Sequence, residues 1–311
     1  MNRKELTGVL IATLCAIIWG SSFVFSAVLS DKMNPVVFAI IRYGLASIGL
    51  AVIFAFSKKK IWLNLKDAPV MAISGIIAQA VFFYTSLLAL QYISASEVGV
   101  INGMIPIFTL LVSIIFYRRL PTPIQAIAVA LSFSGAYFIA SDPGNKFQGL
   151  NIGHLYMVIG VLGFVVSTFI NKRLGDRYDG LSTMMYQFIF ATLALLTMMF
   201  VQGTDFSEAA VILDNGYYLF CTLALGLVCS AAAYVMYFYS LQMAGVERAN
   251  MVQNLIPLSA YVLSIFMLGE SVTLQKTLGI LLVILSLFIF NITMEQIQSF
   301  LGRKPKELSA S

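Results

Sequence analysis

Long apolar runs, each ended by a turn or by a cluster of charges, follow one another along most of this chain. The clusters Ser57-Lys58-Lys59-Lys60 and Asp142-Pro143-Gly144-Asn145 are two such ends. A helix that crosses a bilayer needs about 20 predominantly apolar residues, and the runs reach that length. The pattern predicts an all-α membrane protein with ten transmembrane helices, at about residues 7–29, 35–56, 69–90, 96–117, 123–141, 152–171, 181–201, 218–240, 248–268 and 275–293.

The basic residues are distributed unevenly over the segments between these spans. With the N-terminus in the cytoplasm, cytoplasmic segments hold 15 of the 19 Lys and Arg residues, and outer segments hold only Lys32, Lys146 and Lys276. The outer loop 202–217 carries three acids and no base. Because cytoplasmic loops of membrane proteins are enriched in Lys and Arg, we predict an integral plasma (inner) membrane protein with both termini in the cytoplasm.

The fourth and ninth spans have similar sequences. Residues 98–115 align with residues 249–266 when Pro106 is matched to Pro257, and the same offset places Asn102 over Gln253. Chance similarity between apolar helices is the alternative explanation. The matched prolines and polar residues favour duplication of a five-span unit.

Duplication divides the chain into a first five-helix repeat, 1–145, and a second one, 146–311, which ends in a basic cytoplasmic tail. Because five is odd, the second copy enters the membrane from the opposite side, and the two repeats are inverted. Inverted repeats are typical of alternating-access transporters, whose substrate site lies near the midplane between the halves.

The composition supports a lipid environment and excludes several classes of function. The 311 residues are 59% hydrophobic and 11% charged, whereas soluble domains carry about 25% charged residues. The net charge of +5 comes with no basic recognition module, so nucleic acid is not expected as a partner. The single histidine, His154, has no Cys or carboxylate neighbours in the sequence to form a metal site. We expect no cofactor, and no Walker A loop is present to bind ATP.

Three short motifs carry a resemblance to a known family. They are Trp19-Gly20-Ser21-Ser22-Phe23 in the first span, Asn254-Leu255-Ile256-Pro257 in the ninth, and Leu268-Gly269-Glu270 followed by Gly279. Because these motifs occur in this order, the chain resembles the EamA family of the drug/metabolite transporter (DMT) superfamily, over about residues 7–293. The resemblance implies transport but no particular substrate. The first-half equivalent of Gly269-Glu270 is Arg118-Arg119, so the role of Glu270 is not expected to repeat there.

Polar and aromatic residues near the middle of the spans are the candidate substrate contacts, because polar groups in lipid usually face a cavity or a partner helix. For the amides next to the prolines, an equal alternative is hydrogen bonding between helices. For the aromatic residues, the alternative is packing against neighbouring side chains or lipid. We expect one central cavity, mostly apolar and aromatic with a few amides. Its predicted lining is Trp19, Gln79, Tyr84, Asn102, Tyr234, Gln253 and Asn254.

Arg42 is a charged residue inside a predicted span, and Glu97 is the nearest acid by depth. A carboxylate partner lowers the cost of an arginine in the membrane. We therefore predict that the two side chains approach each other in at least one state. A purely structural pair and a snorkelling arginine are the alternatives to a site where Glu97 binds a proton or a cationic substrate.

These features predict a secondary transporter that moves a small metabolite by alternating access, with export as the favoured direction. The solute is expected to be amino acid-like, amphipathic or singly charged. A proton is a candidate coupling ion, facilitated diffusion is the alternative, and the protein is expected to be a monomer or a dimer in the lipid bilayer. A lipid or drug flippase is the alternative function. An intramembrane enzyme is disfavoured because no predicted span contains an Asp pair or a Ser–His arrangement.

Overall fold

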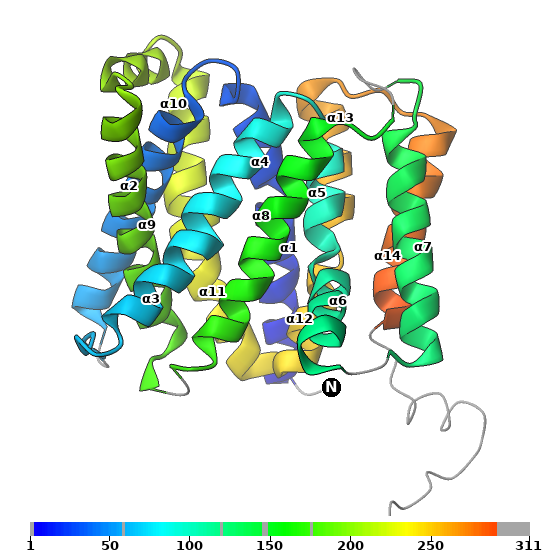
Figure 1. The fold of residues 1–311 in the computed structure, drawn as a ribbon, viewed down its shortest axis with the longest axis horizontal. Coiled ribbons are helices and arrows are strands. Elements are labelled where there is room, and N and C mark those ends of the chain that lie inside the picture. Colours follow the sequence, from blue (N-terminus) through cyan, green and yellow to red (C-terminus); the bar gives the residue numbers. More distant parts are fainter. Residues whose placement is uncertain (1–2, 58–59, 119–120, 145–148, 175–176, 291–311) are drawn as a thin grey trace, which may run out of the picture.

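A computed structural model describes residues 3–57, 60–118, 121–144, 149–174 and 177–290. The predicted basic tail and the end of the tenth predicted span fall outside these ranges. The described chain is built from helices and connecting loops (Figure 1). In chain order the helices are α1 (Arg3–Leu29), α2 (Pro35–Phe56), α3 (Ala68–Gly75), η1 (Ile76–Val81), α4 (Phe82–Leu90), α5 (Ala95–Gly103), α6 (Ile105–Tyr117), α7 (Pro123–Ala140), α8 (Ile152–Asn171), α9 (Gly180–Gln202), η3 (Phe206–Leu213), α10 (Gly216–Leu223), η4 (Ala224–Ala232), α11 (Ala233–Ala244), α12 (Val246–Gln253), α13 (Ile256–Leu268) and α14 (Leu274–Phe290).

The lengths and composition of these helices support a membrane protein with many spans. Among the described residues, eight helices are long and apolar enough to cross a bilayer. A ninth is added if α5 and α6, which meet at an angle of 45°, count as one bent span. Helix α14 is a shorter apolar helix, so the count of ten stays a prediction.

Two of the long helices change their winding part way along. The segments η1 and η4 are π-helical, and each continues an α-helix before and after it. π-Helical turns inside α-helices occur frequently at functional sites. Segment η1 carries Gln79, and η4 carries Ser230. These two residues correspond under the same offset that matches Pro106 to Pro257.

The helix pairs α5–α6 and α12–α13 are interrupted immediately before a proline. Pro106 and Pro257 occupy the first turns of α6 and α13, where a missing N–H group leaves no hydrogen bond unmade. Helices α5 and α13 also pack closely against each other. A Cβ atom on Gly103 would lie 2.3 Å from Cγ of Pro257, so a glycine is needed for the two helices to approach this closely.

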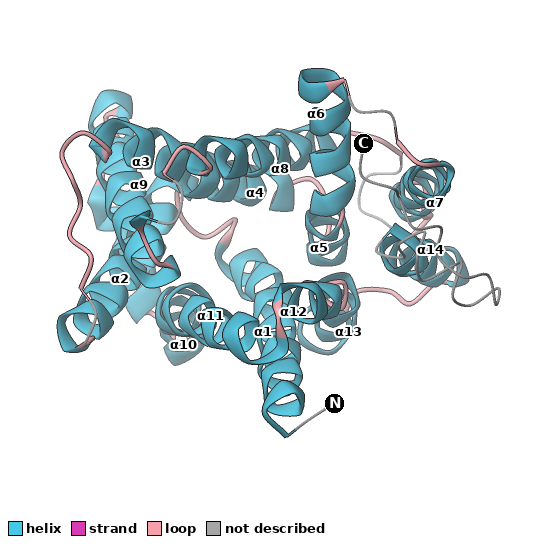
Figure 2. Cartoon of the chain, turned by 90° about the horizontal axis from the view of Figure 1, so that it is seen from below, coloured by secondary structure: helices cyan, strands magenta, loops and turns pink. Residues whose placement is uncertain are grey.

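The helices surround the centre of the molecule in two groups (Figure 2). Helices α3, α4 and α8 lie on one side, and α1, α11, α12 and α13 lie on the other, while α7 and α14 pack together at one end. The buried side chains form two clusters. One joins α2 and α9 to η4, and the second joins α1, α5 and α8 to α13 and α14.

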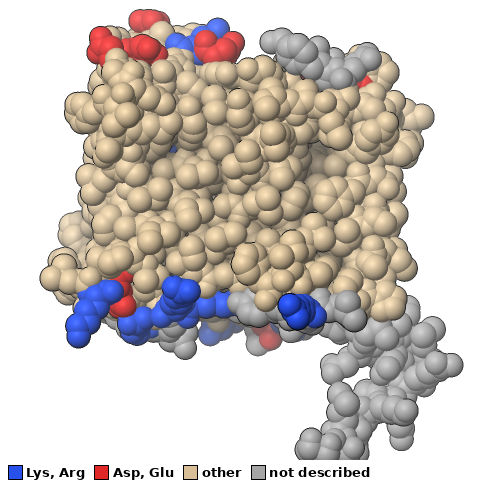
Figure 3. Space-filling view, viewed as in Figure 1, with Lys and Arg blue, Asp and Glu red and all other residues tan. Residues whose placement is uncertain are grey.

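The two edges of the molecule differ in charge (Figure 3). On the face shown, Lys and Arg side chains gather along the edge where α1 begins, which we call the basic edge, and most Asp and Glu side chains lie along the opposite, acidic edge. The broad band between them is almost free of charged side chains. Large apolar side chains such as Leu10, Ile48, Phe200 and Phe266 are exposed, as expected of a surface in contact with lipid.

Candidate functional site

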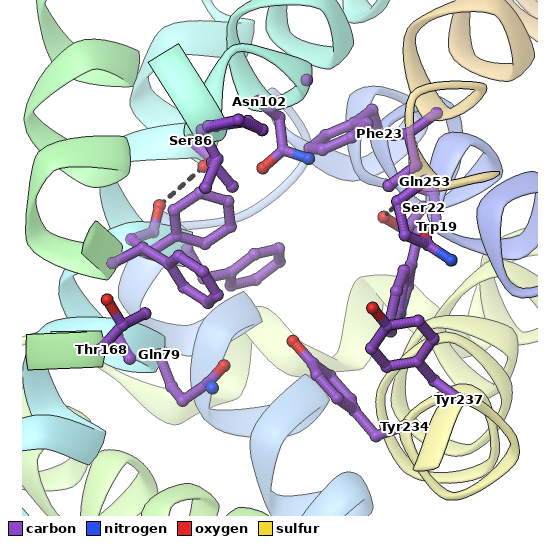
Figure 4. A pocket seen from close by; sticks show the side chains of 18 of the residues that line it. Trp19, Ser22, Phe23, Gln79, Ser86, Asn102, Thr168, Tyr234, Tyr237 and Gln253 are labelled. Carbon is purple, nitrogen blue, oxygen red and sulfur yellow. Dashed lines mark hydrogen bonds between the residues drawn. The ribbon is translucent and has the colours of Figure 1, made fainter. Parts of the chain in front are cut away.

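A central cavity of about 700 Å³ lies between the two groups of helices. Most of its lining comes from α1 and α2, from η1 and α4, from α5 and α6, and from η4, α11 and α12. One or two residues each come from α7, α8, α9, α13 and α14. The close view in Figure 4 shows side chains from these elements converging on one space. A cavity of this size is within the range that takes up a small organic molecule.

Six of the seven predicted substrate contacts line this cavity. They come from both halves of the chain and are Trp19, Gln79, Asn102, Tyr234, Gln253 and Asn254. No single helix could bring them together, because they lie on α1, η1, α5, α11, α12 and the turn after α12.

Trp19 anchors an aromatic wall of the cavity. Its indole Nε1 donates a hydrogen bond to the carbonyl oxygen of Cys229 at 3.1 Å. Its ring centroid lies 5.1 Å from that of Tyr234 and 5.2 Å from that of Tyr237. Tyr237 follows Tyr234 by one helical turn, and both hydroxyl groups point into the cavity (Figure 4). The hydroxyl of Tyr237 donates to Oδ1 of Asn250, so this wall offers ring faces, the hydroxyl of Tyr234 as donor or acceptor, and the hydroxyl oxygen of Tyr237 as acceptor.

The amide groups of the lining keep unused hydrogen-bonding capacity. Gln253 donates from Nε2 to the carbonyl oxygen of Ala12 at 3.2 Å, which joins α12 to α1. Its Oε1, the Nε2 of Gln79 and the Nδ2 of Asn254 are buried without a hydrogen-bond partner among the described residues. Buried polar groups are usually paired, so these three atoms are suited to meet a polar group brought by a ligand or water.

Tyr84 is not among the residues that line the cavity, so its predicted position is wrong for this conformation. The stripe of α4 that faces the cavity contains Phe82, Phe83, Ser86 and Leu90. On a helix, residues three or four apart share a face, and Tyr84 falls outside that stripe. It packs instead against the buried cluster of α2 and α9.

Arg42 and Glu97 do not pair in this conformation. Glu97 is used at the start of α5, where its Oε2 accepts hydrogen bonds from the backbone N–H of Ser94 at 2.8 Å and from its hydroxyl at 2.8 Å. Its Oε1 lies 3.4 Å from Nε2 of His154. Arg42 instead donates to hydroxyl groups and lines the central cavity. Because α5 needs an acceptor at its N-terminus, Glu97 is occupied there.

Glu97 and His154 belong to a separate, mostly apolar cavity of about 370 Å³, which also contacts α7. Glu97, the carboxylate predicted as a candidate proton site, therefore lies on the wall of a cavity other than the central one. Among the described residues that line the central cavity there is no Asp or Glu.

Several polar lining residues were not predicted from the sequence, including Ser86, Thr168 and Asn250. Ser86 and Thr168 donate to carbonyl oxygens of their own helices, and such serines and threonines are common in membrane helices. Only their position on the helix face toward the cavity distinguishes them from other serines and threonines in the spans. Ser230, which lies near the middle of its predicted span, also lines the cavity, and the repeat offset places it opposite Gln79.

Comparisons with known proteins agree with this arrangement. The family model described as "EamA-like transporter family" matches the chain twice, over residues 6–141 and 151–292. An uncharacterized transporter of Archaeoglobus fulgidus is 25% identical over 90% of this chain and 97% of its own length. The uncharacterized inner membrane transporter YicL of Salmonella typhimurium is 25% identical, over 94% of this chain and 96% of its own.

Two further matches concern function and fold. A protein of Streptantibioticus cattleyicolor named "Probable terminal-alkyne amino-acid exporter" is 25% identical over 83% of this chain and 84% of its own. A crystal structure that is 12% identical in sequence superimposes with a TM-score of 0.64, over 92% of this chain and 98% of that one; this likeness concerns the fold alone. The two matches to the family model together cover most of the sequence, and the chain therefore belongs to the EamA-like transporter family.

Proposed function

We propose that this protein is a secondary transporter that exports a small metabolite across the inner membrane by alternating access. The metabolite is amino acid-like, amphipathic or singly charged. The observation that carries the proposal is the central cavity, whose lining comes from both segments that match the family model. Aromatic rings and a few amides in a largely apolar cavity suit a solute with a small polar part and an apolar body. The exporter named among the relatives supports the direction.

The architecture we propose is ten spans arranged as two inverted five-helix repeats, 1–145 and 146–311. Three features support it: the family model matches twice, a π-helical segment occurs at corresponding places, and a proline break occurs at corresponding places. An odd number of spans in each repeat inverts the second one relative to the first. The two repeats can then exchange conformations, which moves the opening from one face of the membrane to the other.

We assign the basic edge to the cytoplasm, because Lys and Arg are enriched on that side of membrane proteins. The cavity extends toward this edge. Gln125 in the first turn of α7 and Thr168 in the last turn of α8 both line it, and these helix ends lie at the basic edge (Figure 1). The conformation described here then corresponds to an inward-facing state. A transporter of this kind would load its substrate from the cytoplasm, as export requires.

Transport in proteoliposomes tests the proposal. Purified protein is reconstituted and the uptake of labelled amino acids, small aromatic acids and their amides is measured against empty liposomes. For a transported solute, Gln79→Ala should lower the flux about 3- to 10-fold, the effect of losing one hydrogen bond to the substrate. Gln202→Ala makes the same chemical change at an exposed position at the end of α9 and should leave the flux unchanged. Equal fluxes for the two variants would show that the central cavity does not carry the substrate.

A further inference from the structure

Arg42 is a buried charge in a part of the chain where charges are costly. It lies about two turns into α2 and is only 9% exposed. A guanidinium is a permanent cation in proteins. Ionisable residues inside a membrane usually pair with an opposite charge or mark the path of a substrate.

Among the described residues, the contacts of Arg42 supply no counter-charge for its guanidinium. Its Nε donates to the hydroxyl of Ser230 at 3.0 Å, and its Nη1 donates to the hydroxyl of Ser26 at 3.4 Å. The guanidinium carbon lies 4.2 Å from the centre of the Phe83 ring. No carboxylate of the described residues forms an ion pair with it, and Nη2 has no hydrogen-bond partner among them.

These contacts orient the guanidinium and leave part of it available. A cation–π contact and two neutral hydroxyl acceptors lower the cost of the buried charge, but none of them neutralises it. The guanidinium presents five N–H donors in a flat fork that matches the two oxygens of a carboxylate. The Ser230 bond connects α2 to η4, so both halves of the chain hold the fork in place.

The other side chains of the cavity wall determine which net charge on a solute the cavity can accommodate. Among its described lining residues, Arg42 is the only side chain with a full charge, and no Lys, His, Asp or Glu accompanies it. A second negative group on the same solute would have no cation to meet. The remaining walls are mostly rings and aliphatic groups with amides and hydroxyls between them.

We propose that Arg42 is the anion receptor of this transporter and that it binds the carboxylate of an organic solute that carries one net negative charge. The apolar or aromatic body of the solute then lies between the aromatic wall of Trp19 and Tyr234 and the rings of α4. This inference rests on the proposed function, because it names the substrate class of the same cavity. It also explains why an arginine lies in the membrane with no acidic partner among the residues that the structure describes.

The protein offers an internal reporter for binding. Its two tryptophans are Trp19 in the cavity and Trp62, which is 73% exposed. In a Trp62→Phe background all tryptophan fluorescence comes from Trp19. The probes are 3-phenylpropionate and its isosteric amide, 3-phenylpropanamide, titrated in detergent in chloride-free buffer. A separate titration with chloride tests for an inorganic anion site.

The expected result is that the carboxylate binds about 10- to 100-fold more tightly than the amide, as a charge-assisted hydrogen bond provides. Arg42→Gln should remove this preference, so that the two probes bind within about 2-fold of each other, while Arg42→Lys should keep part of it. Ser230→Ala keeps the charge and removes one orienting bond, and should weaken carboxylate binding by less than Arg42→Gln does.

Three results would overturn the proposal. The first is equal affinity for the two probes, or no saturable quenching by either, in the protein that retains Arg42; this measurement does not depend on the folding of any Arg42 variant. The second is a carboxylate preference that survives in Arg42→Gln. The third is saturation by chloride that matches the carboxylate and competes with it, which would make this an inorganic anion site.

Flux of the same two probes in proteoliposomes separates this inference from the proposed function. Selective binding of the carboxylate without flux would retain the receptor and contradict transport. Flux of both probes without selectivity for the carboxylate would retain transport and contradict the receptor.

Discussion

At the scale of single residues, buried charges are tolerated where a neighbouring element supplies their partners. Lys276 was placed in an outer loop by its sequence position, yet it is 2% exposed, and its Nζ lies 2.6 Å from Oε2 of Glu270. The same carboxylate accepts a hydrogen bond from the hydroxyl of Ser96 at 2.5 Å and lies at the N-terminus of α5. A negative charge is favourable there because of the helix dipole. Glu270, part of the motif that supports the family resemblance, thus joins the second half of the chain to the first.

This contact predicts a stability pattern. Lys276→Met leaves the Glu270 carboxylate, whose side chain is 11% exposed, without its cation and should destabilise the protein by up to about 3 kcal/mol. The double variant Lys276→Met with Glu270→Gln removes both charges at similar volume, and should recover a large part of that loss. Thermal unfolding in detergent measures both. If the double variant unfolds at a lower temperature than Lys276→Met alone, the two side chains do not act as a pair.

At the scale of helices, small residues and special backbone positions decide how elements meet and end. Gly269 ends α13 in the left-handed conformation, with φ of 67°. At the corresponding end of α6, Arg118 adopts a φ of 50°. The two helix ends are therefore alike in backbone shape although their sequences differ. The crossing of α5 and α13 depends similarly on backbone approach, because Gly99 faces Ala260 and Gly103 faces Pro257.

The crossing gives a prediction with a matched control. Gly103→Ala would place a methyl group against the rigid ring of Pro257, and overpacking of this kind costs about 1–3 kcal/mol. Gly44→Ala adds the same methyl group where no atom lies within 4 Å, and should leave stability unchanged or slightly higher. The melting temperature in detergent is the measurement. Equal melting temperatures for the two variants would mean that α5 and α13 are farther apart in the membrane than here.

At the scale of the whole molecule, the charge difference between the two edges predicts its orientation. The segment 60–67, which leads into α3, lies near the basic edge, and the turn between η3 and α10, which contains Asp214, lies at the acidic edge. Lys60 and Asp214 are exposed, whereas the native Cys15, Cys221 and Cys229 are buried. Single substitutions at the two positions can therefore be labelled selectively.

A membrane-impermeant maleimide should label Asp214→Cys in intact cells and Lys60→Cys only after the membrane is opened. The unsubstituted protein is the control for labelling of the native cysteines. Labelling of Lys60→Cys, but not of Asp214→Cys, in intact cells would invert the orientation and make the present conformation outward-facing.

What could be predicted from the sequence depended on local composition. Apolar runs of membrane-spanning length and the placement of Lys and Arg are visible residue by residue, and both predicted a helical membrane protein whose edges differ in charge. Six of the seven residues predicted to line the cavity do line it, because polar and aromatic groups near mid-span are rare enough to be recognised in the sequence. The family motifs then indicated transport.

Tertiary structure decided which side each of these residues faces and what it contacts. Tyr84 packs against the buried cluster of α2 and α9 and does not line the cavity, because the π-helical turn and the helical period set which stripe of α4 faces inward. The predicted partner of Arg42, Glu97, is taken by the N-terminus of α5, while Ser230 reaches Arg42 from 188 residues away. Depth along a helix can be read from a sequence, but rotation about the helix axis and distance to another helix are set by packing, and these placed Arg42 on the wall of the central cavity and Glu97 on the wall of another.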